Sequence, residues 1–262
     1  MHDFLNIGGT KAGNTKYCFF TYKKIFEEII KTLDKSKYNG EIILPKQLVF
    51  NYDNIIPTSQ IVNNSVCLLK NKITIQNDII KLTNAKIADI KHRMFIIPID
   101  GLSAFANGNS DFSIVFILQQ ELLENENQFE LINVSVFNPI RKDITVFDKE
   151  EGCKYNGKKI ALDDVHTEKR LDVIFCNNDE QKISFDLTTL AQKSNSLSLS
   201  SSIFSSIVNL LITNKNLCIA KINPEFQLAV EFMCRQTLLT MHKIGNHYAI
   251  GKKDIIDKLI KK

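Results

Sequence analysis

Asp100 is the residue whose side chain, in its sequence context, could take part in chemistry. An apolar run, Met94–Ile97, leads into Pro98-Ile99-Asp100-Gly101, and a second apolar run, Phe112–Leu118, follows. Short β-rich runs interrupted by Pro, Asp and Gly predict a strand, a tight turn and a second strand. The turn would present one carboxylate at a strand end. That carboxylate could join others around a divalent cation, or it could cap the backbone of Gly101.

Other patterns that carry chemistry are missing from the sequence. Metal-assisted hydrolysis of a phosphate ester needs clustered carboxylates that hold two or more divalent ions, and the turn supplies one. The five histidines show no HExxH pattern, and no GxSxG nucleophile elbow occurs. The six cysteines have no CxxC or Cys/His ligand spacing, so they predict reduced core thiols rather than a zinc site or a disulfide framework.

Composition limits the classes of protein. A chain of 262 residues with 44% hydrophobic content can bury a substantial core. Its 33 basic and 29 acidic residues are spread along the chain, and the net charge of +4 does not indicate nucleic acid. No apolar run approaches the roughly 20 residues of a membrane span, and the first residues lack the apolar segment of a signal peptide. We therefore expect a cytoplasmic protein with no membrane partner.

Two stretches resemble the inositol monophosphatase family. Its signature is Asp-Pro-Ile/Leu-Asp-Gly-Thr followed by Asn-Phe and a Phe-rich strand, and residues 97–105 with Phe112 keep this frame. Pro139, Arg141 and the Asn156-Gly157 turn match a strand meander of the family. The resemblance implies an α/β (α+β) fold, a five-layer αβαβα sandwich, and a homodimer. It also implies Mg²⁺-dependent hydrolysis of a small phosphomonoester such as inositol monophosphate.

The resemblance further implies which positions bind metal and substrate. Asp100 would be a catalytic residue and a metal ligand, and Ile99 would be a second metal position. The substrate-binding positions would be Gly101, Leu102, Ser103, Ser205 and Ser206. Phe204 stands where the family has a glycine, so its bulk would crowd a ligand.

Most of the family's functional side chains are replaced in this sequence. The family's other acidic and hydroxyl positions fall on Tyr22, Pro45, Ile97, Leu102 and Gln227. Because Mg²⁺ needs formally charged oxygen ligands, these replacements predict weak or lost activity. The remaining role would be binding or regulation, with a protein partner.

Two alternatives retain enzymatic activity. In the first, Glu41 or Asp111 replaces the missing ligands, and the protein is an active inositol-phosphate phosphatase. Glu41 is four residues from Pro45, about 13 Å along a strand, and is a poor replacement. In the second, the protein is a 3′(2′),5′-bisphosphate nucleotidase, because Asn109-Ser110-Asp111-Phe112 resembles the corresponding segment of those enzymes.

Periodicity predicts the elements that must position these residues. Apolar residues at helical spacing predict helices over 22–33 and from Phe226 onward. Alternation over 130–136, followed by the Asn156-Gly157 turn, predicts an antiparallel meander. The serine-rich segment 194–206 predicts a strand and a turn, and the resemblance places the start of a helix after it.

The chain divides into two halves that would form one compact unit. Residues 1–165 would form an N-terminal α+β half, and residues 166–262 a C-terminal α/β half. The spacing exceeds that of the family between about 46 and 96, which implies an insertion. Its β-rich pieces predict an added hairpin with a turn at Asn71-Lys72.

Overall fold

In the computed structural model, the described residues form three helices and two large sheets. The described residues are 40–43, 48–51, 54–57, 73–76, 79–82, 92–101, 104–105, 109–122, 128–160, 171–176, 190–192, 194–213 and 215–260. The expected helix over 22–33 and the boundary at 165–166 lie outside them.

The larger sheet has nine strands and is mostly antiparallel. In sheet order they are β11 (Lys158–Lys159), β10 (Gly152–Tyr155), β9 (Asp143–Asp148), β8 (Phe129–Asn138), β7 (Ser113–Glu121), β6 (His92–Asp100), β1 (Gly40–Ile43), β5 (Ile79–Leu82) and β4 (Ile73–Gln76). Only the pair of β1 with β6 is parallel. The predicted meander is confirmed, and its turn at Asn156-Gly157 has φ of 47° and 78°, as a two-residue hairpin of the Asn-Gly kind requires.

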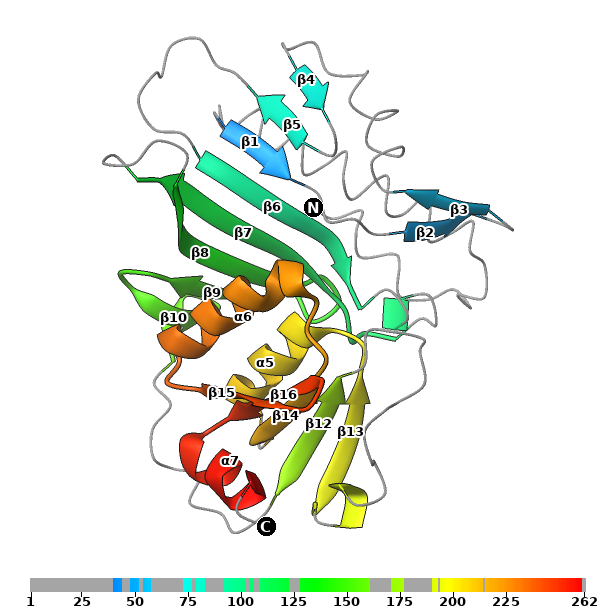
Figure 1. Ribbon diagram of the computed structural model, residues 1–262, viewed down its shortest axis with the longest axis vertical. Coiled ribbons are helices and arrows are strands. Elements are labelled where there is room, and N and C mark those ends of the chain that lie inside the picture. The colour runs from blue at the N-terminus through cyan, green and yellow to red at the C-terminus, as the bar shows by residue number, and fades with distance from the viewer. Residues whose placement is uncertain are drawn as a thin grey trace.

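The segment of the expected insertion contains an antiparallel hairpin, in which β4 pairs with β5. The predicted turn at Asn71-Lys72 lies outside the described residues. A second antiparallel pair, β2 (Leu48–Asn51) with β3 (Asn54–Pro57), forms a sheet of its own. Figure 1 shows β1, β4 and β5 at the upper edge of the large sheet.

The central strands of the smaller sheet are buried on both faces. It contains, in order, β13 (Ser196–Ser200), β12 (Asp172–Cys176), β14 (Leu217–Ala220), β16 (His247–Gly251) and β15 (Thr240–Ile244). Along β12, Ile174 and Cys176 belong to one apolar cluster, while Val173 and Phe175 belong to another. Successive side chains of a strand point to opposite faces, so a strand covered on both sides is apolar throughout.

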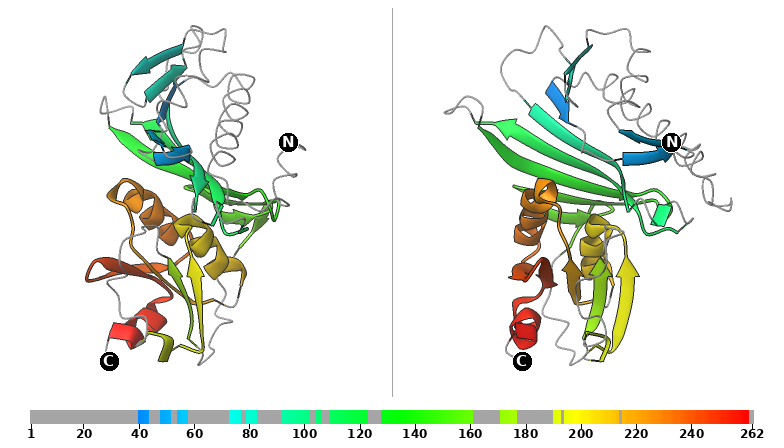
Figure 2. Two further views of the ribbon diagram at one scale, coloured as in Figure 1. Left: turned by 90° about the vertical axis from the view of Figure 1, so that its right-hand side faces the viewer. Right: turned by 45° about the vertical axis from the view of Figure 1, so that its right-hand side comes forward.

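Three helices complete the layers. Helices α5 (Ile203–Ile212) and α6 (Pro224–Gln236) lie between the two sheets, and α7 (Lys253–Ile260) lies on the far side of the smaller sheet (Figures 1 and 2). Ser202 and Asn223 are the N-caps of α5 and α6, and Pro224 occupies the first turn, where it costs no hydrogen bond. The described layers are therefore sheet, helix pair, sheet and helix, which confirms the expected α+β sandwich.

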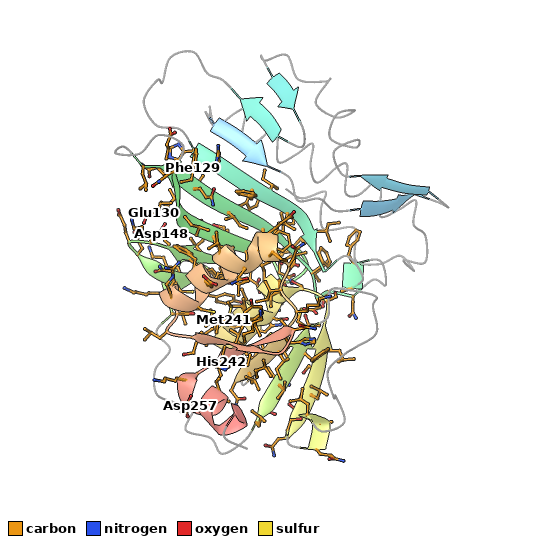
Figure 3. The ribbon with its side chains drawn as sticks, in the orientation of Figure 1. Phe129, Glu130, Asp148, Met241, His242 and Asp257 are labelled. Atoms are coloured by element: carbon orange, nitrogen blue, oxygen red, sulfur yellow. The ribbon has the colours of Figure 1, made fainter. Side chains whose placement is uncertain are left out.

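The main core lies between the sheets. Its largest fully buried side chains include Phe147 from β9, Phe204 from α5 and Ile97 from β6. Figure 3 shows side chains of both sheets meeting around α5 and α6, while the labelled Glu130 and Asp148 lie at the left edge of the large sheet, near the start of β8 and the end of β9. None of the helices in the described residues is long and apolar enough to cross a membrane.

Candidate active site

Asp100 ends strand β6, as predicted, but the turn before it is different from the predicted one. The strand continues through Pro98 to Asp100, and the register against β7 shifts between Ile97 and Asp100, so a bulge replaces the predicted turn. Gly101 follows with φ of +91°. A Cβ at Gly101 would lie 2.7 Å from the carbonyl oxygen of Asp111. Only glycine therefore lets β6 pass this close to the start of β7.

The Asp100 carboxylate lies at the N-terminus of helix α5. Its Oδ2 accepts hydrogen bonds from the Ser202 hydroxyl and from the Phe204 N–H, the latter at 3.0 Å. Ser202 is also the N-cap residue, since its Oγ accepts a bond from the Ser205 N–H at 3.0 Å. Asp100 thus satisfies N–H groups that the helix itself leaves unpaired. The sequence had suggested a cap on Gly101, and the structure shows a cap on α5.

Burial governs the charge of Asp100. Its side chain is 4% exposed, and desolvation raises its pKa to about 7. The hydrogen bonds from Ser202 and Phe204 lower the pKa in part, and the negative charge of Asp111 raises it further. A carboxyl group with this pKa is a mixture of acid and carboxylate near neutral pH.

Asp111 is the second carboxylate at this end of α5. Its Oδ2 accepts a hydrogen bond from the Ser201 N–H at 3.3 Å. The Ser201 hydroxyl in turn accepts a bond from the Ala104 N–H at 3.1 Å. Both acidic side chains therefore bind the segment that leads into α5.

Two of the serines that the resemblance assigns to substrate, Ser205 and Ser206, lie in the first turn of α5 and are buried. The Ser206 hydroxyl donates to the Ser202 carbonyl oxygen at 2.6 Å and contacts Ser200 Oγ at 2.8 Å. The Ser205 hydroxyl is buried and has no hydrogen-bond partner among the described residues. Ser206 is thus already paired within the protein, and Ser205 is the buried hydroxyl without a partner.

Phe204 and Gln227 are also engaged within the protein. The Phe204 ring is fully buried and lies 5.9 Å from the ring of Phe226, centroid to centroid. Its bulk thus belongs to the core between α5 and α6. Gln227 donates to Glu231 Oε1 at 2.8 Å and accepts from the Tyr248 hydroxyl at 3.2 Å.

Of the remaining predicted positions, some are buried in the core and the others lie outside the described residues. Ile97 and Ile99 are fully buried. Tyr22, Pro45, Leu102 and Ser103 lie outside the described residues.

The described residues do not fit a magnesium site. Nowhere among them do three His, Cys, Asp or Glu side chains come together around a position for a metal ion. The backbone of Glu41 lies far from Asp100 along the sheet, because it pairs with Arg93, seven residues from Asp100 on β6. That separation is about 23 Å along a strand. Asp100 and Asp111 remain as a pair. Asp100 already accepts hydrogen bonds from Ser202 and from the first turn of α5, and Asp111 accepts one from the segment that leads into α5.

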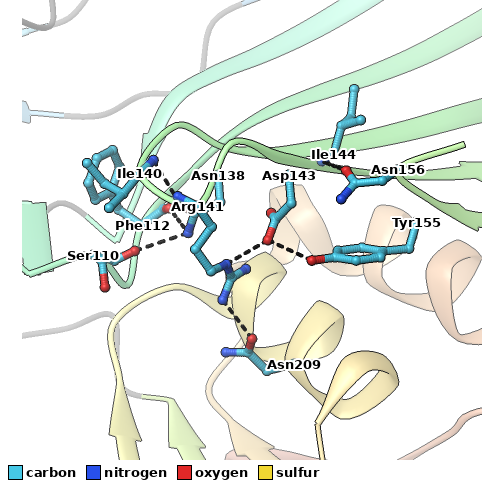
Figure 4. A network of polar contacts seen from close by, with 10 residues as sticks. All are labelled: Ser110, Phe112, Asn138, Ile140, Arg141, Asp143, Ile144, Tyr155, Asn156 and Asn209. Atoms are coloured by element: carbon cyan, nitrogen blue, oxygen red, sulfur yellow. Dashed lines mark hydrogen bonds and ion pairs between the residues drawn. The ribbon is translucent and has the colours of Figure 1, made fainter. Parts of the chain in front are cut away.

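A polar network links α5 to the large sheet through Asn209 (Figure 4). Arg141, in the turn after β8, donates to Asp143 at 2.8 Å and to Asn209 of α5 at 3.0 Å. Tyr155 donates to the same Asp143 oxygen at 3.1 Å. Asn138 caps the turn through the N–H groups of residues 140 and 141. The Pro139 and Arg141 motif therefore positions α5.

Sequence reasoning missed Ser202 as the partner of Asp100. The available signal was a serine directly before an apolar run of helical spacing, which is typical of an N-cap. Nothing in the local pattern pairs it with a carboxylate 102 residues away.

Solved structures with a similar fold, among them inositol monophosphatase family proteins, superimpose on this chain over most of its length. One is the extragenic suppressor protein suhB from Bartonella henselae, with 14% identity, a TM-score of 0.61, and coverage of 99% of this chain and 96% of that chain. Identity this low shows the fold alone.

Two further solved structures carry ligands. A Ca-bound IMPase family protein from Staphylococcus aureus has 15% identity and a TM-score of 0.56, and covers 92% of this chain and 81% of its own. An IMPase/NADP phosphatase complexed with NADP and Ca²⁺ has 14% identity and a TM-score of 0.55, and the match covers 91% of this chain and 80% of that chain. No protein-family model matches the sequence, and no curated protein matches it either.

Proposed function

We propose that this protein has the inositol monophosphatase fold with weak or no phosphatase activity, and that it acts as a binding or regulatory protein. The proposal concerns a cytoplasmic homodimer that recognises a protein partner. The position at which hydrolysis would take place in an active phosphatase lies at the end of β6.

The observation that supports the proposal is the state of Asp100. Its carboxylate is buried and accepts hydrogen bonds from Ser202 and Phe204. A metal-binding carboxylate must be ionised and must offer its oxygens to the ion. Burial raises the pKa of Asp100 to about 7, and Oδ2 already serves as the cap of α5. This carboxyl group therefore acts as a part of the fold.

The alternative is Mg²⁺-dependent hydrolysis of inositol monophosphate or of an adenosine bisphosphate. The solved relatives with Ca²⁺, and with NADP and Ca²⁺, favour this second candidate. On this alternative Asp100 and Asp111 would be metal ligands, Gly101, Ser205 and Ser206 would contact substrate, and Ile99 would contribute a further metal contact. Further carboxylates would have to come from outside the described residues.

Release of inorganic phosphate distinguishes the two candidates. The full chain is incubated with inositol monophosphate, adenosine 3′,5′-bisphosphate or NADP across a Mg²⁺ series. Our proposal expects no Mg²⁺-dependent release above that of Asp100→Asn. Release that rises with Mg²⁺ and disappears in Asp100→Asn would establish the alternative.

Asp143→Asn is the matched control for that experiment. Asp143 is also a buried carboxylate, but its partners are Arg141 and Tyr155 rather than α5. Activity that both variants lose would reflect general damage to the fold. Activity that only Asp100→Asn loses would assign the chemistry to Asp100. Titration calorimetry with Mg²⁺ gives a second readout, and our proposal expects no heat of binding that depends on Asp100.

A further inference from the structure

Two turns of the large sheet lie side by side at one end of its strands. The chain runs antiparallel through β8, β9, β10 and β11, so the β8–β9 turn at residues 139–142 and the β10–β11 turn at Asn156-Gly157 fall at the same end. Asn156 joins them, since its N–H donates to the Ile144 carbonyl oxygen at 2.8 Å and its Oδ1 accepts from the Ile144 N–H at 2.9 Å (Figure 4). The two turns therefore form one corner of the sheet.

Basic side chains gather at this corner. Arg141 and Lys142 belong to the first turn, Lys158 and Lys159 are the two residues of β11, and all four are exposed. The carboxylate of Asp143 is 3% exposed and pairs with Arg141 at 2.8 Å, so these two charges offset each other. The three lysines have no ion-pair partner among the described residues.

The opposite end of the same strands carries ion pairs. There Lys149 pairs with Glu130 at 2.7 Å, and Lys154 pairs with Glu151 at 2.5 Å. Glu150 adds a further negative charge in the turn between β9 and β10. Charge is thus segregated along these strands, and the positive excess lies at the corner.

Two aliphatic side chains are exposed at the same corner. Ile140, in the first turn, is 36% exposed, and Ile144, on β9, is 41% exposed. Figure 4 shows Ile144 directed away from α5, whereas Arg141 reaches toward Asn209 of α5. A partner that covers the isoleucines gains hydrophobic free energy in proportion to the apolar area it removes from water. The corner thus offers both charge and apolar surface.

We infer that this corner binds an acidic protein segment in which carboxylates alternate with aliphatic side chains. The carboxylates pair with Lys142, Lys158 and Lys159, and the aliphatic side chains cover the two isoleucines. Complementary charge of this kind raises the association rate and selects the partner. The inference rests on the proposed function, because it gives the protein partner of that proposal its chemistry.

The corner favours a protein segment over nucleic acid or a membrane. Single-stranded nucleic acid is bound by stacking bases on aromatic rings, and Tyr155 of β10 is half-buried with its hydroxyl bonded to Asp143. Sites for anionic lipid usually hold roughly four to eight basic residues, and here Arg141 is already paired. Lysines on an edge strand also oppose the addition of another strand, so the segment binds through its side chains.

Fluorescence anisotropy with a labelled peptide tests the charges. The probe is a short peptide in which single leucines alternate with pairs of glutamates, and the reference peptide has glutamine for every glutamate. The unsubstituted full chain should bind the probe at least about tenfold more tightly than the reference at low salt, and added salt should reduce this preference. Lys158→Gln with Lys159→Gln should weaken probe binding about threefold to tenfold.

The matched control for this variant is Lys243→Gln with Lys253→Gln. It removes the same charge from exposed lysines of β15 and α7, and it should leave probe binding unchanged. Absent or equal binding of the two peptides by the unsubstituted chain would overturn the inference. Equal losses in the β11 variant and in its control would do so as well.

A substitution of Ile144 tests the apolar part of the corner. Ile144→Thr keeps a β-branched side chain on β9 and should weaken probe binding about threefold or more. Leu228→Gln is the control, because Leu228 is 64% exposed on α6, and it should bind as the unsubstituted chain does. Circular dichroism checks that each variant is folded. A folded Ile144→Thr that binds the probe unchanged would refute the apolar contact.

Two further measurements separate the remaining outcomes. Capture of the full chain by phosphatidylserine vesicles that the β11 variant loses, without probe binding, would assign the corner to a membrane and overturn the inference. Phosphate release across the Mg²⁺ series, measured on the same proteins, tests the proposed function separately. Neither probe binding nor release would overturn the inference alone. Mg²⁺-dependent release that Asp100→Asn loses would overturn the proposed function, whatever the probe does.

Discussion

Asp100→Asn should make the protein more stable above neutral pH. The reason is the raised pKa of Asp100, about 7, which burial causes. The folded protein then binds a proton that the unfolded chain has already lost, so this group's contribution to stability is full below about pH 4. It disappears as the pH rises through about 7. Asparagine occupies the same volume, can accept from Phe204, and cannot ionise.

The expected magnitude follows from the pKa. A rise from 3.8 to about 7 corresponds to about 4 kcal/mol of unfolding free energy, at about 1.4 kcal/mol per pH unit. Asn also changes the bond with Ser202, because its amide N–H₂ donates where the carboxylate accepted. The Ser202 hydroxyl can accept that bond. We therefore expect Asp100→Asn to gain up to about 4 kcal/mol relative to the unsubstituted protein between about pH 5 and about pH 8.

Urea unfolding followed by circular dichroism measures this difference. Comparing the two proteins at each pH removes the contribution of all other ionisable groups, which they share. Thr145→Val is the control, because it alters a buried polar side chain on β9 that does not ionise. Its difference from the unsubstituted protein should be constant across the same pH range.

One result would refute the reasoning about Asp100. If the carboxylate is needed in its ionised form as the cap of α5, Asp100→Asn should lose stability as the pH rises. A loss of about 1–3 kcal/mol at pH 8, the usual cost of an impaired buried hydrogen bond, would show that hydrogen bonding outweighs desolvation at this site. The carboxylate would then be available to a cation, and the proposal for the protein's function would need revision.

Three further changes are predicted from the backbone and the buried hydroxyl groups. Gly101→Ala should cost about 2 kcal/mol or more in urea unfolding, because φ is +91° and the new Cβ would meet Asp111 at 2.7 Å; an unchanged midpoint would show that this segment can shift. Leu238→Gly should raise the melting temperature, with a gain of about 1 kcal/mol, since Leu238 has φ of 57° after α6 and is 81% exposed; a lower melting temperature would mean that the leucine makes a contact. Thr145→Val should gain about 1 kcal/mol, because the buried hydroxyl of Thr145 has no partner among the described residues; a loss of stability in the same assay would indicate a hidden partner.

Local patterns predicted the elements that local physics decides. The alternation along 130–136 predicted β8, and the Asn156-Gly157 pair predicted a hairpin turn whose positive φ angles the structure confirms. The apolar spacing after Phe226 predicted α6, which runs over Pro224–Gln236. In each case neighbouring residues carry the whole signal, because side-chain direction and turn conformation depend on a few dihedral angles.

Contacts between distant segments were not predicted. The sequence suggested a turn at Pro98–Gly101 and an Asp100 that caps Gly101, whereas β6 continues to Asp100 and its carboxylate caps α5. Phe204 was expected to crowd a ligand, and its ring packs in the core against Phe226. Both contacts depend on which helix lies beside β6, and local sequence patterns do not contain that information.

The sequence by itself determined strand β8, helix α6 and the two-residue turn at Asn156-Gly157, and it pointed to Asp100 as the carboxylate to consider. The tertiary structure decided the chemical state of that residue. Asp100 is an ordinary carboxylate until β6 and α5 meet, 102 residues apart in the chain. Their contact removes water from the group and supplies the Ser202 and Phe204 donors. The pKa and the available oxygens of a buried carboxylate depend on these surroundings, and only the folded chain provides them.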